Sequence, residues 1–187
     1  MTILARIDND YQCLRSYFQK LFDILTDSLA EDRNAPVEAL DAGATESLAS
    51  YHGFSHFIKP DMLSNIYSFV DFWMQEICRY QQVGKDLSLS HKDIKGDHAL
   101  HAYRKYLTLY AGLDLSAAER SYEHLANLRK VRNYFMHSGG HVPKEKEQEL
   151  SAINGITVFA SLIAVDQNFV WASLDHANRF LRAAAEA

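Results

Sequence analysis

An arginine and a histidine, Arg132 and His137, lie five residues apart near the end of one helical pattern, and Asn133 follows the arginine directly. A histidine can hold and exchange a proton near neutral pH, which contributes on the order of 10² to 10⁴ in rate. A guanidinium can neutralise the oxygens of a phosphorane. Such a set fits cleavage of RNA by its own 2′-hydroxyl, a reaction for which no metal is obligatory. We therefore take Arg132, His137 and Asn133 as candidate catalytic residues and expect no metal or other cofactor.

The helical wheel places these side chains relative to the core. At about 100° per residue, Leu125, Leu128 and Val131 form one apolar stripe, and Arg132 lies at its edge. A guanidinium there must reach solvent or find an anionic partner, because burying it unpaired is prohibitive. His137 lies in the last turn, where the negative end of the helix dipole favours the protonated imidazole.

Arg129 and Lys130 add positive charge just before the arginine, and we take both as candidate RNA- or phosphate-binding residues. The net charge of the chain is −5, so the protein has no global field that would attract nucleic acid. A phosphate site must therefore be local.

One set of this kind lacks a second proton carrier. Cleavage needs an acceptor for the proton of the 2′-hydroxyl and a donor for the leaving oxygen. A two-fold axis brings identical patches together without additional sequence. Two copies that face each other would supply both groups, which predicts a homodimer.

The pattern Arg132-Asn133-x-x-x-His137 resembles the Arg-(four to six residues)-His signature of the HEPN superfamily. Other segments resemble successive landmarks of the abortive-infection-like branch of that family, and the resemblance covers roughly residues 60 to 140. These segments are residues 66–71 (IYSFVD), 93–96 (DIKG), 106–107 (YL) and 125–129 (LANLR).

The resemblance implies a helical bundle and a metal-independent endoribonuclease whose site lies in a homodimer cleft. It also implies a toxin or phage-defence role, with an antitoxin protein as a further partner. The chain departs from relatives in two places. Gly139 stands where some members that pair with a nucleotidyltransferase antitoxin have tyrosine, so that regulatory chemistry is not supported. Asp71 stands where relatives often have glutamate, and it is the candidate acidic partner of Arg132.

The rest of the sequence predicts a single all-α domain over residues 1–187. Only 3 Pro and 8 Gly are present, which favours helices over a many-turned β architecture. Four to five main helices are expected to form the bundle, and apolar residues recur at helical spacing in several stretches. The predicted helices cover residues 4–29, 61–84, 98–111, 116–138 and 159–184, with a capping box formed by Ser116 and Glu119 at the start of the fourth.

Two segments are expected to be non-helical. Residues 31–60 lose the helical period and collect Pro and Gly, which predicts a long irregular insertion between the first two main helices. Asn154-Gly155 between short runs with β-branched residues predicts a small β-hairpin near residues 150–158.

Cys13 and Cys78 lie inside apolar helical patterns and are expected to be core thiols. No apolar run approaches the roughly 20 residues of a membrane span. The N-terminus has no signal-peptide core, because Arg6 and Asp8 interrupt it. The sequence thus predicts a cytoplasmic protein without a membrane partner.

Alternatives from other classes remain open. His98 and His101, with Asp97 and His91, could share a metal ion at helical spacing, although capping or surface roles are more common for such histidines. His124 is assigned to the surface. Fold does not guarantee activity, so the chain could also be a non-catalytic helical module that binds nucleotide, RNA or a protein partner through the same cleft.

Overall fold

A computed structural model describes the backbone of residues 2–33 and 43–187 and the side chains of residues 2–26 and 56–187. Helices dominate this part of the chain, and one short hairpin interrupts them. The helices are α1 (Ile3–Arg33), α2 (Gly43–Gly84), α3 (Ala99–Lys105), α4 (Glu119–Ser138), α5 (Lys144–Ser151) and α6 (Gln167–Glu186). The hairpin strands are β1 (Ile156–Phe159) and β2 (Leu162–Val165).

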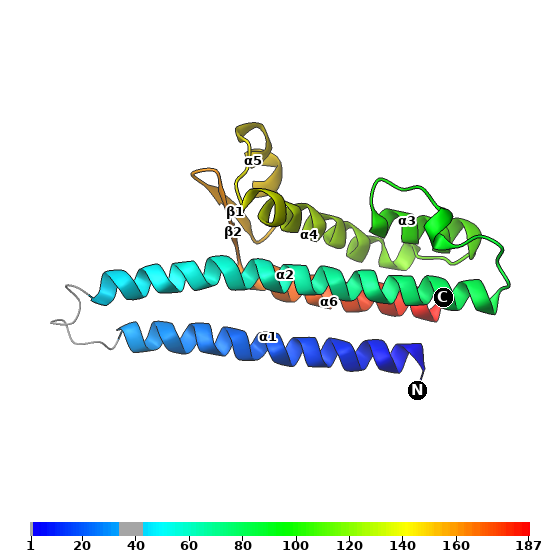
Figure 1. Cartoon of the computed structure of the whole chain (residues 1–187), viewed down its shortest axis with the longest axis horizontal. Coiled ribbons are helices and arrows are strands. Elements are labelled where there is room, and N and C mark those ends of the chain that lie inside the picture. Colours follow the sequence, from blue (N-terminus) through cyan, green and yellow to red (C-terminus); the bar gives the residue numbers. More distant parts are fainter. Residues whose placement is uncertain (1, 34–42) are drawn as a thin grey trace.

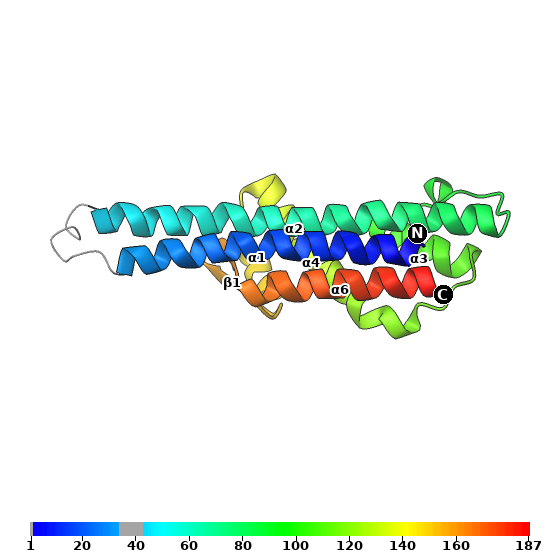
Figure 2. The same cartoon turned by 90° about the horizontal axis from the view of Figure 1, so that it is seen from below.

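Three long helices pack against one another as a three-helix bundle. α1, α2 and α6 run side by side, and both ends of the chain lie near the same end of this bundle (Figures 1 and 2). α4 packs across α2 and α6 from the other side, and α3 lies beside α2 near its C-terminal end (Figure 1). α4, which carries the predicted site, is therefore held by two of the three long helices.

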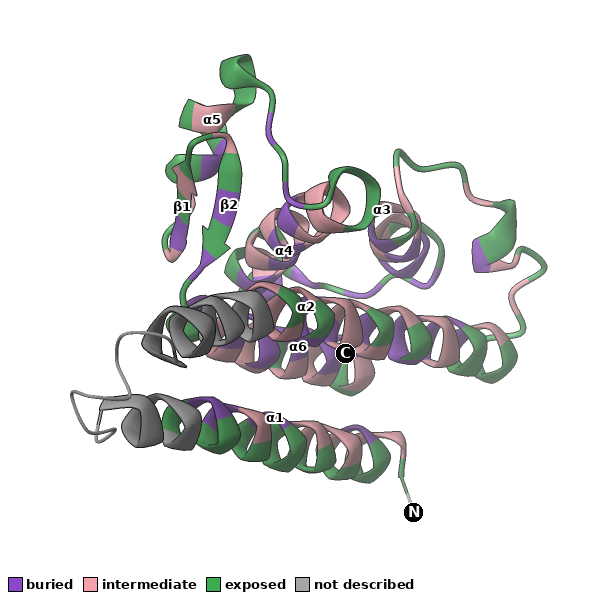
Figure 3. Ribbon diagram, turned by 60° about the vertical axis from the view of Figure 1, so that its left-hand side comes forward, coloured by how far each residue is buried: buried purple, intermediate pink, exposed green. Residues whose placement is uncertain are grey.

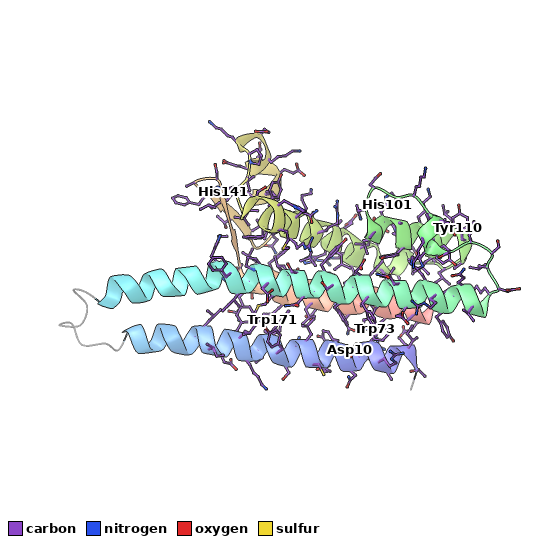
Figure 4. All side chains as sticks on the ribbon, viewed as in Figure 1. Asp10, Trp73, His101, Tyr110, His141 and Trp171 are labelled. Carbon is purple, nitrogen blue, oxygen red and sulfur yellow. The ribbon has the colours of Figure 1, made fainter. Side chains whose placement is uncertain are left out.

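The core lies where α6 meets its neighbours. The apolar stripe of α6 is buried against α1, α2 and α4, and the buried faces turn inward in Figure 3. Trp73 from α2 is 1% exposed and donates its indole N–H to Asp10 of α1 at 3.1 Å (Figure 4). Side chains of this core in α6 are Phe169, Val170, Leu174, Ala177, Phe180, Leu181 and Ala184.

The all-α class and the predicted helical bundle are confirmed, and helices are observed at each predicted place. α1 covers the first predicted helix, and α4 ends at Ser138 as expected. The helix predicted from residue 98 appears as α3, which continues into a π-helical turn, Tyr106–Tyr110, before Gly112 at a φ of 71°. The predicted capping box is wrong, because α4 begins at Glu119 with Ala118 as its N-cap, and the Glu119 side chain pairs with Arg104.

The predicted irregular insertion over residues 31–60 is wrong wherever the structure describes it. α1 continues to Arg33, and α2 begins at Gly43 and passes through Pro60. A proline in a helix removes one backbone hydrogen bond and a glycine costs about 1 kcal/mol, so a well-packed helix can absorb both. Met62 and Leu63, just after the proline, are fully buried. The part of the prediction that falls on residues 34–42 lies outside the described residues.

The hairpin exists, but the predicted turn is displaced. Asn154-Gly155 precedes β1, and the strands join through Ala160 and Ser161, both at positive φ (48° and 63°). Ile156 pairs with Val165 across the hairpin, and Asp166 then caps α6 by accepting from the Asn168 N–H. The last helix therefore begins at Gln167 and not at residue 159. The charged stretch before the hairpin folds as α5.

One of the two predicted core thiols is confirmed. Cys78 is fully buried, and burial raises the pKa of its thiol to about 12. Cys13 is exposed. It lies about 120° from the buried stripe of α1 that contains Ile7, Phe18 and Leu25. None of the described helices is both long and apolar enough to cross a membrane.

Truncation of one core ring should measure how much α6 packing contributes to stability. Phe180 is 0% exposed, and Phe180→Ala should lower the free energy of unfolding by about 3–5 kcal/mol through lost burial and a residual cavity. Phe159→Ala is the matched control, because Phe159 in the hairpin is 80% exposed and should change stability by less than about 0.5 kcal/mol. Urea unfolding followed by circular dichroism measures both. Equal losses in the two variants would contradict the central role of α6.

Candidate functional site

A pocket of about 400 Å³ lies between α2 and α4. α4 contributes Arg132 to it, and α2 contributes the remaining side chains. The residues from α2 are Tyr67, Ser68, Asp71, Phe72 and Gln75. Tyr67, Asp71 and Gln75 follow one another at intervals of four, which places them on one face of a helix.

Arg132 is the central group of this pocket. Its guanidinium carbon lies 5.6 Å from the centre of the Tyr67 ring, and Nη1 donates to Oδ1 of Asn133 at 3.3 Å. Its Nε is buried and has no hydrogen-bond partner among the described residues. Arg132 lines the pocket and forms no ion pair with a carboxylate of the described residues, so its guanidinium is available to an anionic ligand.

Arg129 lies close to the same tyrosine. Its Nε is also buried without a partner in the described part of the chain. Burial raises the pKa of the Tyr67 hydroxyl, and the charges of Arg129 and Arg132 partly offset this rise. The positive charges of two guanidinium groups thus both affect the Tyr67 hydroxyl between α2 and α4.

Asp71 lines the pocket but forms no ion pair with Arg132. One carboxylate oxygen accepts from the Tyr103 hydroxyl at 2.9 Å, and the other accepts from Nε2 of Gln75 at 2.8 Å. Burial and the bond to Asp71 raise the pKa of Tyr103. The predicted acidic partner is therefore near the arginine but is occupied by neutral donors.

His137 lies in the last turn of α4 and is exposed. α4 stops there because Gly139 and Gly140 adopt positive φ (59° and 85°), and their N–H groups bond to the carbonyls of Phe135 and Tyr134. The side chain of His137 makes no hydrogen bond or ion pair with any residue that the structure describes. Five residues of helix advance about 7.5 Å along the axis and turn about 140°, so His137 does not share a face with Arg132.

Lys130 is not brought to this pocket. Its Nζ lies 2.6 Å from Oε1 of Glu149 on α5, and Lys146 binds the other oxygen of the same carboxylate at 3.0 Å. The two bonds lower the pKa of Glu149 to about 2. The structure thus groups Arg132 with Asn133, Arg129 and Asp71, and it places Lys130 elsewhere.

Sequence reasoning missed two sets of residues. Tyr67 and Gln75 could have been found from the four-residue spacing with Asp71. His124, assigned to the surface, is half-buried, so that assignment is wrong. It lies one turn before Leu128 and about 40° from it on the wheel, so α6 covers it.

His124 and His176 stack with their ring centres 4.4 Å apart. Nε2 of His124 is 2.9 Å from the Ser173 hydroxyl, and Nδ1 of His176 is 3.0 Å from the Ser121 hydroxyl. Burial lowers the pKa of His124 to about 4 and also lowers that of His176. The pair therefore joins α4 to α6 in the neutral state.

The histidines near α3 do not form a metal centre with their neighbours. His98 accepts the His101 N–H at Nδ1 and so caps α3, and His101 lies 3.5 Å from Asp97. Within residues 2–26 and 56–187, no three His, Cys, Asp or Glu side chains are placed to hold a metal ion. A capping role accounts for His98.

Comparisons with known proteins leave the chain without an assigned relative. A scan against models of protein families gives no match. Searches of curated proteins and of solved structures give none either. Any statement about function must therefore rest on the chemistry of the residues.

The histidine pair should make stability fall in mild acid. A histidine whose pKa is lowered in the folded state binds fewer protons there than in the unfolded chain, so the free energy of unfolding falls as the pH drops below the unfolded value of 6.5. The loss should be on the order of 2 kcal/mol between about pH 7 and about pH 5, after allowance for partial exposure. Arg120 and Arg179 disfavour protonation of His176, and Asp175 opposes them.

Urea unfolding across this pH range measures the effect. His124→Gln, which keeps a polar group beside Ser173, should remove most of the loss. The exposed His141 provides the control, and His141→Gln should leave the pH dependence unchanged. The same loss in His124→Gln as in the unsubstituted protein would show that another group is responsible.

Proposed function

We propose that the chain is a metal-independent endoribonuclease of the HEPN kind, which cleaves RNA by attack of the 2′-hydroxyl. Arg132 stabilises the phosphorane, His137 transfers the proton, and Asn133 is their polar companion. The observation that carries the proposal is that Arg132 lines an open pocket and forms no ion pair with a carboxylate in the described part of the chain.

The charge balance around Arg132 supports a phosphate ligand. Asp71 is the carboxylate that lines its pocket, and both of its oxygens already accept hydrogen bonds. Arg129 adds a second guanidinium with an unpaired buried nitrogen. The net charge of the chain is −5, so a phosphate can be attracted only by a local group of positive charges. Guanidinium groups that form no ion pair with the described carboxylates provide such a group.

A homodimer completes the proposed mechanism. In one copy, Arg132 and His137 point from different faces of α4, and no second proton carrier hydrogen-bonds with His137 in the described part of the chain. A two-fold axis near the C-terminal end of α4 would place the two histidines on one phosphate, one as base and one as acid. An RNA-cutting enzyme of this kind would serve as a toxin or phage-defence component that an antitoxin protein restrains.

A second candidate function is a non-catalytic module that binds nucleotide, RNA or a protein through the same pocket. The isolation of His137 favours it, because no described side chain orients the imidazole for proton transfer. Cleavage experiments separate the two candidates.

Substitution of either proposed catalytic residue should abolish cutting without unfolding the protein. Purified protein should cleave single-stranded RNA in the presence of EDTA and leave a 2′,3′-cyclic phosphate. Arg132→Ala and His137→Ala should each reduce the rate by at least about 10². Gel analysis of labelled RNA measures the rate, and mass spectrometry identifies the product ends.

Matched controls come from exposed residues outside the pocket. Arg79→Ala on α2 and His141→Ala after α4 should cut as fast as the unsubstituted protein. If the unsubstituted protein leaves RNA intact but binds it, the second candidate function replaces the first. If all four variants lose activity equally, the pocket around Arg132 is not the site.

The proposed homodimer is tested by measuring the molar mass of the protein in solution. Light scattering should give twice the 21.3 kDa of one chain at the concentrations at which RNA is cut. Cleavage that stays proportional to protein concentration while the mass is that of a single chain would contradict the two-copy mechanism.

A further inference from the structure

A second cavity, of about 700 Å³, lies between α4, α6 and residues 152–155. On the helical wheel, the mean direction of Asn127 and Lys130, which line it, lies about 160° from the mean direction of Arg129 and Arg132. The cavity therefore opens on the face of α4 opposite to the proposed ribonuclease pocket. Its volume is typical of small-molecule sites, which occupy roughly 300–1,000 Å³.

The stacked histidines present hydrogen-bonding edges in this cavity. Both rings line it, and each uses one nitrogen on a serine hydroxyl. Nδ1 of His124 and Nε2 of His176 have no partner among the described residues. The His124 ring packs against two other rings, since His176 stacks on it with ring centres 4.4 Å apart and the Phe169 ring centre lies 5.2 Å away. A ligand would meet these rings edge-on.

Three carboxamides add further unpaired groups. Asn127 from α4, Asn154 before β1 and Asn168 from α6 line the same cavity, and none of their side chains bonds to a residue in the described part. Each amide offers a donor and an acceptor side by side. The lining is thus rich in paired donors and acceptors that no described residue satisfies.

The charges at the cavity do not suit a free phosphate or a metal ion. The Lys130 ammonium is neutralised by Glu149, and Arg120 is offset by Glu123 on the same helix. Asp166 adds a further carboxylate. The described residues hold no three metal-ligating side chains in one place. A neutral polar ligand fits this balance better than an anion does.

We propose that this cavity binds a purine base, and adenine in particular, through the amide of Asn127 and the free nitrogens of His124 and His176. A purine is planar and neutral, and donors and acceptors alternate along its edge. An asparagine amide matches N6 and N7 of adenine in a two-bond arrangement. The base comes either from a free nucleoside or from a nucleic-acid strand, since both present the same edge.

Isothermal titration calorimetry with adenosine, cytidine and inorganic phosphate tests the proposal. Adenosine should bind in the micromolar range, cytidine should bind at least about tenfold more weakly, and phosphate should not compete with adenosine. Asn127→Leu should weaken adenosine binding at least about tenfold, because the bidentate contact is lost. Asn65→Leu, a change of the same kind on α2, should leave the affinity unchanged. If Asn127→Leu does not fold, Asn127→Asp serves in its place with the same expectation, because it keeps the shape of the side chain but removes the N–H donor.

The source of the base is resolved by titration with short single-stranded oligoadenylate. Equal affinity for adenosine and the oligomer indicates a free nucleoside, whereas tighter binding of the oligomer, weakened by Asn127→Leu, indicates a strand. No binding of adenosine at millimolar concentration, equal binding of cytidine, competition by phosphate, or an equal effect of Asn65→Leu would each overturn the proposal. Arg132→Ala should leave adenosine affinity unchanged, so this inference and the ribonuclease proposal can fail separately.

Discussion

Burial of the apolar stripe of α6 is the interaction on which the other elements depend. α6 packs against α1, α2 and α4 at once, and its inner residues, such as Leu174 and Phe180, are 0% exposed. α4 is thereby fixed between α6 and α2, which sets both of its functional faces. α1 and α2 in turn bury part of their inner stripes against α6.

Helical periodicity was sufficient for the class of fold and for the ends of several helices. Gly84 and Gly139 mark helix ends in the sequence and in the structure, since the chain leaves helical geometry at both. The start of α2 could not be predicted from residue types, because Gly53 and Pro60 indicate a break that a continuous helix nevertheless accommodates. The hairpin turn was misplaced for a related reason. Asn154-Gly155 favours a turn, but Ala160 and Ser161 adopt the positive φ values that join the strands.

The sequence was sufficient to predict features of the candidate site that lie within one helix. It was not sufficient to predict contacts between side chains of different helices. The position of Arg132 at the edge of the apolar stripe follows from the wheel, and its buried Nε agrees with that position. The partners of Asp71 do not follow, because Tyr103 reaches it from α3, more than 30 residues away in the sequence. The position of Lys130, away from the Arg132 pocket, likewise does not follow from one helix, because Lys130 forms an ion pair with Glu149 on α5. Contacts between elements therefore decide which charges remain available to a ligand.

The two faces of α4 differ in how their polar groups are balanced. Arg129 and Arg132 leave buried donors without acceptors, which selects for a negative ligand. The opposite face is lined by neutral histidines and amides, with Lys130 already bound to a carboxylate, which selects for a neutral ligand with its own donors and acceptors. Leu125, Leu128 and Val131 separate the faces with side chains that are 0% exposed. The residues of the two faces share no hydrogen-bond or ion-pair partner in the described part of the chain, so substitutions on the two faces should act independently unless they disturb the packing of α4 against α6.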